Sequence, residues 1–212
     1  PRGGSCAGAG GRRAVGGEAP VAEPAAVGQA GQSIHEFRAI WVNACLRYDR
    51  RLAQSVLSQA FALYPAEEVC TQLLQQGLSE VGNTWERGQA TVQQEHFASA
   101  MATHQVERLI GAAPAPWRVG RVLLACPPDE LHDFPLRFLN MLLRQRGWET
   151  IFLGANVPVA QTDSAIAEVK LGLVVLTAHR GATPQMLNWL AGGLGRLGVG
   201  VGLWGRALQR DP

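Results

Sequence analysis

A carboxylate and a histidine with the chemistry of a metal site lie two residues apart, at Glu130 and His132. They follow an apolar run, Val119–Cys126, that predicts a buried strand, and they precede an amphipathic segment, Leu136–Arg146. A histidine on such a loop can bind a metal through one ring nitrogen while a carboxylate orients the other nitrogen. The alternative is an ordinary surface histidine, so a second group of functional residues has to decide between the two interpretations.

Trp85, Glu95 and His96 form a second candidate group. Trp85 falls at the end of one predicted helix, and Glu95 and His96 fall in the first turns of the next. The connection between these helices is short, so we expect the three side chains near one end of a helical bundle. A tryptophan at helical spacing can equally be a core residue, and a glutamate near a helix start can serve the helix dipole. The pattern alone leaves both interpretations open.

The helices that must position this second group occupy residues 33–113. Ser33, followed three residues later by Glu36, has the pattern of a capping box. Apolar residues recur with helical spacing after it, and short connections favour an antiparallel four-helix bundle. The helices are expected after Ser33, from Arg50 to Leu63, between Pro65 and Gly88, and from the N-cap Thr91 to Ile110.

The loop that carries His132 belongs to a second region, residues 117–212, joined to the bundle by the Pro-rich stretch Ala112–Trp117. Strand and helix patterns alternate in this region, which predicts an α/β fold with a doubly wound parallel sheet of the flavodoxin-like Rossmann type. Ligands of such sheets bind at the carboxyl ends of the strands, where His132 is expected. The predicted strands are Val119–Cys126, Trp148–Leu153, Leu173–Leu176 and Val199–Leu203, and the predicted helices are Leu136–Arg146, Val159–Lys170 and Thr183–Leu197.

Composition excludes several classes of function. Apolar residues make up 47% of the 212 residues and charged residues 17%, which is typical of a folded domain. The net charge of +2 provides no electrostatic footprint for nucleic acid. The four cysteines form no CxxC pair, which argues against a thiolate zinc site or a disulfide scaffold and favours a reducing, cytoplasmic location. No apolar run approaches the ~20 residues that span a membrane, and no phosphate-binding glycine motif follows the first strand.

The first 32 residues are rich in glycine and alanine and predict a disordered lead or linker. The sequence begins at Pro1, and its first methionine is Met101. We therefore expect a fragment with another domain upstream. The chain stops soon after the fourth predicted strand, so we expect an α/β domain that either lacks its C-terminal elements or is abbreviated.

With both groups in view, residues from Ile34 to Arg206 resemble the cobalamin-binding light sensors related to MerR-type repressors of the CarH and LitR type. Two motifs carry the resemblance. The first is Trp85, nine residues, then Glu95-His96, and the second is Glu-x-His-x-x at Glu130-Leu131-His132-Asp133-Phe134, with Pro135 where the family has glycine. The segment RGWETIFLGANVP is also similar to the family. More distantly, the chain is similar to the cap-plus-corrinoid module of methionine synthase.

The resemblance implies that cobalamin binds base-off between the bundle and the α/β domain, with His132 as the lower axial ligand of cobalt and Glu130 as its hydrogen-bonding partner. It implies that Trp85 covers the 5′-deoxyadenosyl group, that Glu95 accepts hydrogen bonds from the ribose hydroxyls, and that His96 lines the same pocket. The remaining cofactor-binding residues that it implies are Asp133 beside the axial histidine, and Thr177, Trp204 and Gly205 along the cobalamin tail.

The function implied is that of a non-enzymatic light sensor for adenosylcobalamin, with methylcobalamin as the alternative form. Light would break the cobalt–carbon bond, and the bundle would shift against the α/β domain. A homo-oligomer is expected, with DNA bound only by a domain that this chain does not contain.

Two other functions stay open. A corrinoid carrier for methyl transfer would share His132 and Glu130 but would not need the adenosyl-binding group. A relative that holds another tetrapyrrole such as haem, or acts only in protein–protein contact, is favoured by Trp204 in place of the first glycine of the family's Gly-Gly pair.

Overall fold

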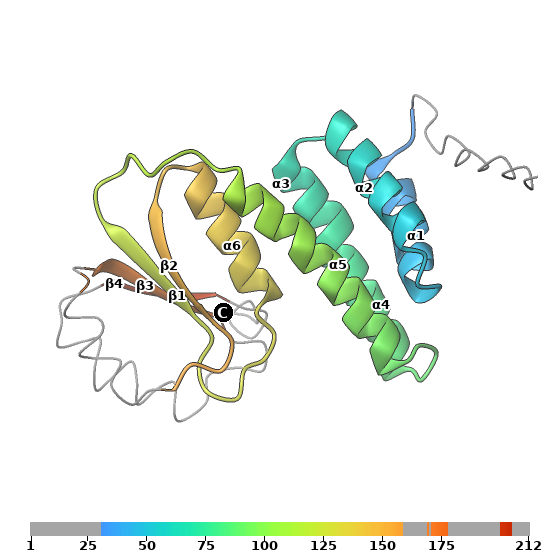
Figure 1. Cartoon of the computed structure of the whole chain (residues 1–212). Coiled ribbons are helices and arrows are strands. Elements are labelled where there is room, and N and C mark those ends of the chain that lie inside the picture. Colours follow the sequence, from blue (N-terminus) through green and yellow to red (C-terminus); the bar gives the residue numbers. More distant parts are fainter. Residues whose placement is uncertain (1–30, 159–168, 170, 178–199, 205–212) are drawn as a thin grey trace, which may run out of the picture.

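The computed structural model describes residues 31–158, 169, 171–177 and 200–204 as a helical layer beside a parallel sheet (Figure 1). The helical part comprises α1 (Ile34–Leu46), α2 (Arg50–Leu63), α3 (Ala66–Glu68), the π-helical segment η1 (Val69–Gln75), α4 (Gln76–Glu86) and α5 (Val92–Gly111). The α/β part comprises β1 (Arg121–Ala125), α6 (Phe134–Gln145), β2 (Glu149–Gly154), β3 (Leu171–Thr177) and β4 (Gly200–Trp204).

The predicted helix starts are confirmed by their caps. The Ser33 hydroxyl accepts a hydrogen bond from the Glu36 backbone N–H at 3.3 Å, and the Glu36 carboxylate accepts one from the Ser33 backbone N–H at 2.7 Å. Thr91 makes the equivalent reciprocal pair with Gln94 at the start of α5. These contacts satisfy N–H groups that a helix start leaves without intrahelical partners.

The third helix differs from the prediction of one regular helix between Pro65 and Gly88. It runs through α3, η1 and α4, and its middle section is π-helical. A widened turn changes which backbone carbonyls are bonded within the helix. The Arg38 guanidinium of α1 donates a 2.8 Å hydrogen bond to the Gln72 carbonyl in η1 and forms an ion pair with Glu80 at 2.7 Å. The irregular segment is therefore held from a neighbouring helix.

The sheet is parallel, with strand order β2-β1-β3-β4. Its strands lie within two residues of the predicted positions. Helix α6 begins two residues earlier than predicted, at Phe134, and places Pro135 in its first turn, where proline is tolerated. The α/β fold class and its flavodoxin-like strand order are thereby confirmed.

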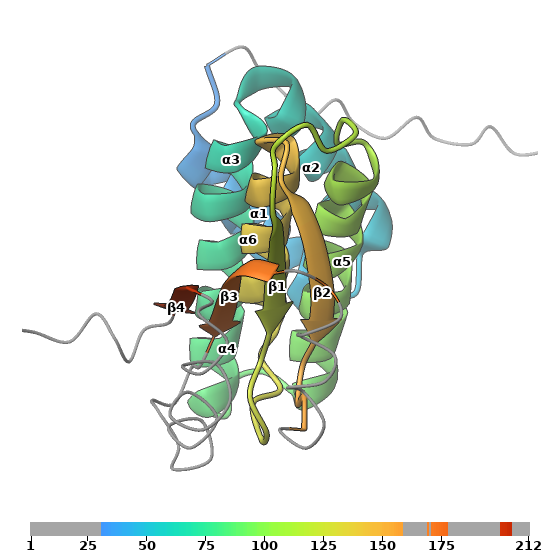
Figure 2. The ribbon, with the colours of Figure 1, turned by 90° about the vertical axis from the view of Figure 1, so that its left-hand side faces the viewer.

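Helix α6 lies between the sheet and the bundle, as Figures 1 and 2 show. Phe138 and Met141 are buried in the core of the bundle, whereas Leu136 is buried against the sheet. Leu142 also packs against the bundle, so the apolar residues of α6 do not all lie on one face as an amphipathic pattern would suggest. One helix therefore contributes to two hydrophobic cores, and this fixes the bundle against the sheet.

The connection between the bundle and the sheet is clipped to the end of α6. The backbone N–H groups of Trp117 and Arg118 both donate to the Gly147 carbonyl at 3.0 Å. The Arg118 guanidinium lies over the rings of Trp117 and Trp148, with its central carbon 4.8 and 5.3 Å from the two centroids. Gly147 has φ +82°, and a Cβ at this position would lie 2.2 Å from the Trp117 ring. Only glycine fits this position.

Several predicted features lie outside the described residues: the lead up to residue 30, the helices Val159–Lys170 and Thr183–Leu197, and Gly205. No helix in the described part of the chain is long and apolar enough to cross a membrane.

Two glycines of one helical stretch provide a test of the packing of the bundle. A Cβ on Gly77 would lie 2.9 Å from Cζ3 of the buried Trp41 ring, whereas a Cβ on Gly82 would have no neighbour within 4 Å. We predict that Gly77→Ala lowers the free energy of unfolding by about 1–3 kcal/mol through overpacking. The matched variant Gly82→Ala should raise it by about 0.5–1 kcal/mol, because alanine favours the helix. Urea denaturation of the two variants measures both changes, and equal effects would contradict the tight contact with Trp41.

Candidate functional site

The structure brings Glu130 and His132 together on the loop between β1 and α6. One oxygen of the Glu130 carboxylate, Oε1, accepts hydrogen bonds from the His132 backbone N–H and from ring Nδ1, both at 2.8 Å. Glu130 is only 7% exposed, whereas the His132 side chain is 59% exposed. Because Nδ1 faces the carboxylate, Nε2 is the ring nitrogen that is suitable for binding a metal.

The loop after β2 supports the loop that carries this pair. The backbone N–H of Asn156 donates to the Glu130 carbonyl at 2.9 Å, and the Asn156 side chain accepts from the Asp129 backbone N–H at 2.9 Å. The backbone N–H of Val157 donates to the Cys126 carbonyl at 3.0 Å. Asp129 and Asn156 both have positive φ, at 67° and 53°, which short polar side chains tolerate. Sequence reasoning missed Asn156 as a supporting residue, although it lies in the GANVP stretch that resembled the family.

Cys126 and Thr177 are buried next to the loop that carries His132. The Cys126 sulfur lies 3.2 Å from the Thr177 hydroxyl and 4.0 Å from the His132 carbonyl oxygen, to which the thiol donates. Burial raises the pKa of the Cys126 thiol to about 11. This thiol is therefore protonated at neutral pH and is a poor metal ligand. Thr177, predicted beside the cobalamin tail, is buried and faces Cys126.

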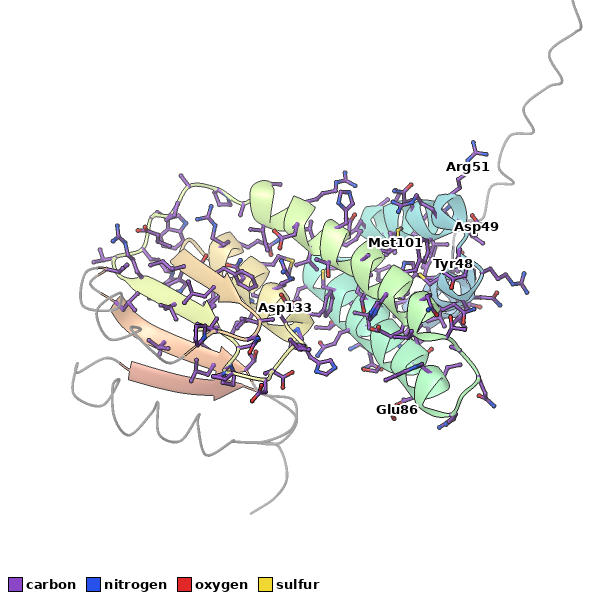
Figure 3. The ribbon with its side chains drawn as sticks, turned by 60° about the horizontal axis from the view of Figure 1, so that its bottom comes forward. Tyr48, Asp49, Arg51, Glu86, Met101 and Asp133 are labelled. Atoms are coloured by element: carbon purple, nitrogen blue, oxygen red, sulfur yellow. The ribbon has the colours of Figure 1, made fainter. Side chains whose placement is uncertain are left out.

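Asp133 follows the histidine directly and has a protein partner. Its carboxylate accepts hydrogen bonds from Nε and Nη2 of Arg137, at 3.0 and 2.7 Å. Asp133 occupies the N-cap position of α6 without a side-chain capping bond. Figure 3 shows Asp133 where the sheet meets the helical layer.

Trp85 lies on the last turn of α4 and is 45% exposed, so the interpretation of Trp85 as an ordinary core residue is wrong. Gly88, with φ +70°, ends this helix as predicted. The Gly88 N–H donates to the Trp85 carbonyl at 2.8 Å, and the Gln89 N–H donates to the Thr84 carbonyl at 2.9 Å. These two bonds are those of a Schellman motif, which fixes the turn between α4 and α5.

Glu95 and His96 lie on the first turns of α5. Glu95 Oε2 contacts His96 Nδ1 at 2.6 Å, and Glu95 Oε1 accepts a 2.7 Å hydrogen bond from the Ser99 hydroxyl. His96 is 75% exposed. Both carboxylate oxygens of Glu95 thus have partners within α5.

The two groups lie toward the same end of the molecule. In Figures 1 and 2, the loop after β1 and the turn between α4 and α5 are both at the lower end, one on the sheet and the other on the bundle. Trp204 ends β4 opposite Thr177, so its backbone is at this same carboxyl edge of the sheet. A ligand between the two layers at this end would have His132 on one side and the α4–α5 turn on the other.

Family models and known proteins agree with this arrangement. Two models, each described as a B12 binding domain, match residues 40–110 and 120–199. The HTH-type transcriptional repressor CarH of Myxococcus xanthus is 32% identical over 160 residues, which are 76% of this chain and 53% of CarH. CarA of the same organism, also an HTH-type transcriptional repressor, is 32% identical over 131 residues, which are 61% of this chain and 43% of CarA.

The chain spans about half the length of these two relatives. The solved structure of the Methanosarcina barkeri monomethylamine corrinoid protein has the same fold, with a TM-score of 0.63 at 19% identity over 84% of this chain and 88% of that chain. The bundle, the parallel sheet and the matched models together identify the cofactor class as a corrinoid, and the chain belongs to the CarH-type family of cobalamin-binding proteins.

Proposed function

We propose that this chain is the sensory part of a regulator that binds adenosylcobalamin base-off and responds to light, and that it is not an enzyme. The observation that carries the proposal is the buried Glu130 carboxylate, which accepts one 2.8 Å hydrogen bond from the exposed ring of His132 and another from the backbone N–H of the same residue. A buried carboxylate is costly unless its oxygens are hydrogen-bonded. A carboxylate that orients a histidine through Nδ1 is the usual support for a histidine that binds a metal through Nε2.

The side chains present fit a corrinoid held between the two layers. His132 would hold the cobalt of the corrinoid from the sheet side. Trp85 offers its exposed ring to the adenosyl group from the bundle side. Glu95 and His96, on the next helix, contact the same group, with Glu95 exchanging its present partners for ribose hydroxyls.

When bound, adenosylcobalamin supplies a cobalt–carbon bond that light cleaves. The protein's part is to hold the two layers in one arrangement while Trp85 is in contact with the adenosyl group, and to relax when that contact is lost. Such a switch requires that the two arrangements of the protein differ in their contacts with the ligand. The adenosyl group would provide this difference, because it contacts only the bundle side.

The output is proposed from the relatives. CarH and CarA are named as HTH-type repressors, and this chain matches about half of each. We infer that the chain controls transcription as a homo-oligomer, with DNA bound by a domain outside these residues. A corrinoid carrier for methyl transfer and a haem-binding relative are the other functions that this fold could serve.

Binding of adenosylcobalamin tests the lower half of the site. The 212-residue chain, titrated in the dark and followed by absorbance, should give a base-off spectrum with histidine bound, and green light should change it. His132→Ala should abolish tight binding, and Glu130→Gln should weaken it by about 10–100-fold, the usual effect of losing a supporting hydrogen bond. His35→Ala, an exposed histidine on α1, is the matched control and should bind normally. Unchanged binding by His132→Ala would contradict the assignment of His132 as the axial ligand. Tighter binding of haem than of cobalamin by the wild type would show that haem is the ligand instead.

The choice of cobalamin form tests the upper half. Trp85→Ala should weaken adenosylcobalamin relative to methylcobalamin by about tenfold, which corresponds to ~1.4 kcal/mol and to the size of one aromatic contact. Leu63→Ala, an exposed apolar residue on α2, should leave the ratio of the two dissociation constants unchanged. Equal weakening of both forms by Trp85→Ala, with methylcobalamin preferred by the wild type, would favour a methyl carrier over a light sensor.

A further inference from the structure

Arg137 connects the loop of His132 to the helical bundle. Its Nε and Nη2 atoms donate to the Asp133 carboxylate at 3.0 and 2.7 Å, and its Nη1 atom donates to the Glu107 carboxylate. Asp133 is the residue after His132, and Glu107 lies on α5. One guanidinium therefore joins two carboxylates that belong to different layers of the molecule.

The surroundings of Arg137 make this bridge more specific than an ordinary surface ion pair. The side chain is 24% exposed, and its guanidinium lies over the Phe152 ring of β2, with 5.0 Å between the central carbon and the ring centroid. Three nitrogens of the planar fork are engaged at once, which the single ammonium of a lysine cannot reproduce. Glu107 is about half exposed, so the bridge should contribute little to the free energy of unfolding. Its main effect should be on the relative position of the two carboxylates.

The bridge lies along the route between the two halves of the proposed site. Glu107 is on the same helix as Glu95 and His96, twelve residues further on, or about 18 Å along the helix axis. A helix such as α5 moves largely as one body. A shift of the turn that carries Glu107 relative to α6 therefore also shifts the other turns of α5. We propose that Arg137 is a positioning residue. It sets the position of the His132 loop along α5, and so relative to Glu95 and His96.

Helix α6 offers a matched comparison at its opposite end. Arg146 donates to Glu67 of α3 at 2.9 Å, which is also an ion pair between α6 and the bundle. That pair is half exposed on both sides and lies at the C-terminal end of α6, whereas the His132 loop lies before the N-terminal end of the same helix. If ion pairs between α6 and the bundle served only to hold the layers together, the loss of either glutamate should have the same effect.

Hydrogen exchange of the full chain without cobalamin tests the proposal directly. Glu107→Gln should speed exchange in the loop 127–134 by about tenfold, the change expected for ~1.4 kcal/mol of lost positioning. Glu67→Gln should leave that loop within about twofold of the wild type. Arg137→Lys should behave like Glu107→Gln, because a lysine keeps the charge but cannot bridge both carboxylates. Exchange of the β3 amides in the same samples reports global unfolding.

A rise confined to the loop supports the positioning role. An equal rise in β3, an equal response to Glu67→Gln, or full rescue by lysine would each overturn it. The consequence for the cofactor rests on the proposed function and is read separately. In the Glu107→Gln protein, adenosylcobalamin should lose affinity about tenfold more than methylcobalamin does, since only the former needs both halves of the site in register. Failure of the wild type to bind cobalamin would refute the proposed function, while the exchange result would still decide the role of Arg137.

Discussion

Burial of α6 on two sides is the constraint on which the rest of the arrangement depends. A helix with one apolar stripe can serve one core, but Phe138 and Met141 extend the bundle's core while Leu136 completes the sheet's core. The layers cannot separate without exposing one of these faces to water, which would cost several side chains' worth of hydrophobic burial. The loop at the start of α6 and the turn between α4 and α5 therefore lie toward the same end of the molecule because of packing remote from both.

Within that frame, the chemistry of the site is prepared by a buried charge. The Glu130 carboxylate is tolerated in the interior because it accepts hydrogen bonds from the His132 ring and from the His132 backbone N–H, while the Asn156 N–H satisfies the backbone carbonyl of Glu130. The same bonds fix the ring of His132 before any ligand arrives, so that binding does not have to order it. Cys126, kept protonated below the loop, adds bulk and a weak donor without competing for a metal.

Local signals in the sequence were sufficient for most elements and insufficient for contacts between them. The caps at Ser33 and Thr91, the glycine stops at Gly88 and Gly147 and the pair Glu130–His132 are short-range features, and the structure has each of them. The π-helical turn was not predicted, and its contact with Arg38 of another helix is a long-range feature that no local pattern contains. The second apolar face of α6 was missed because a single stripe accounts for its pattern. Asp133 was assigned to the cofactor from a motif, and its bond to Arg137 depends on the helix phase.

The clip between Gly147 and Trp117 has a mechanical consequence. It joins the C-terminal end of α6 to the chain that leaves the bundle, and the His132 loop lies at the other end of this twelve-residue helix, about 18 Å away. Given this length, any tilt of α6 about the Gly147 contact is magnified at its far end: a tilt of about 5° would displace the histidine end by roughly 1.5 Å. The packing of α6 in two cores therefore has to suppress even small tilts if the His132 loop is to keep its place.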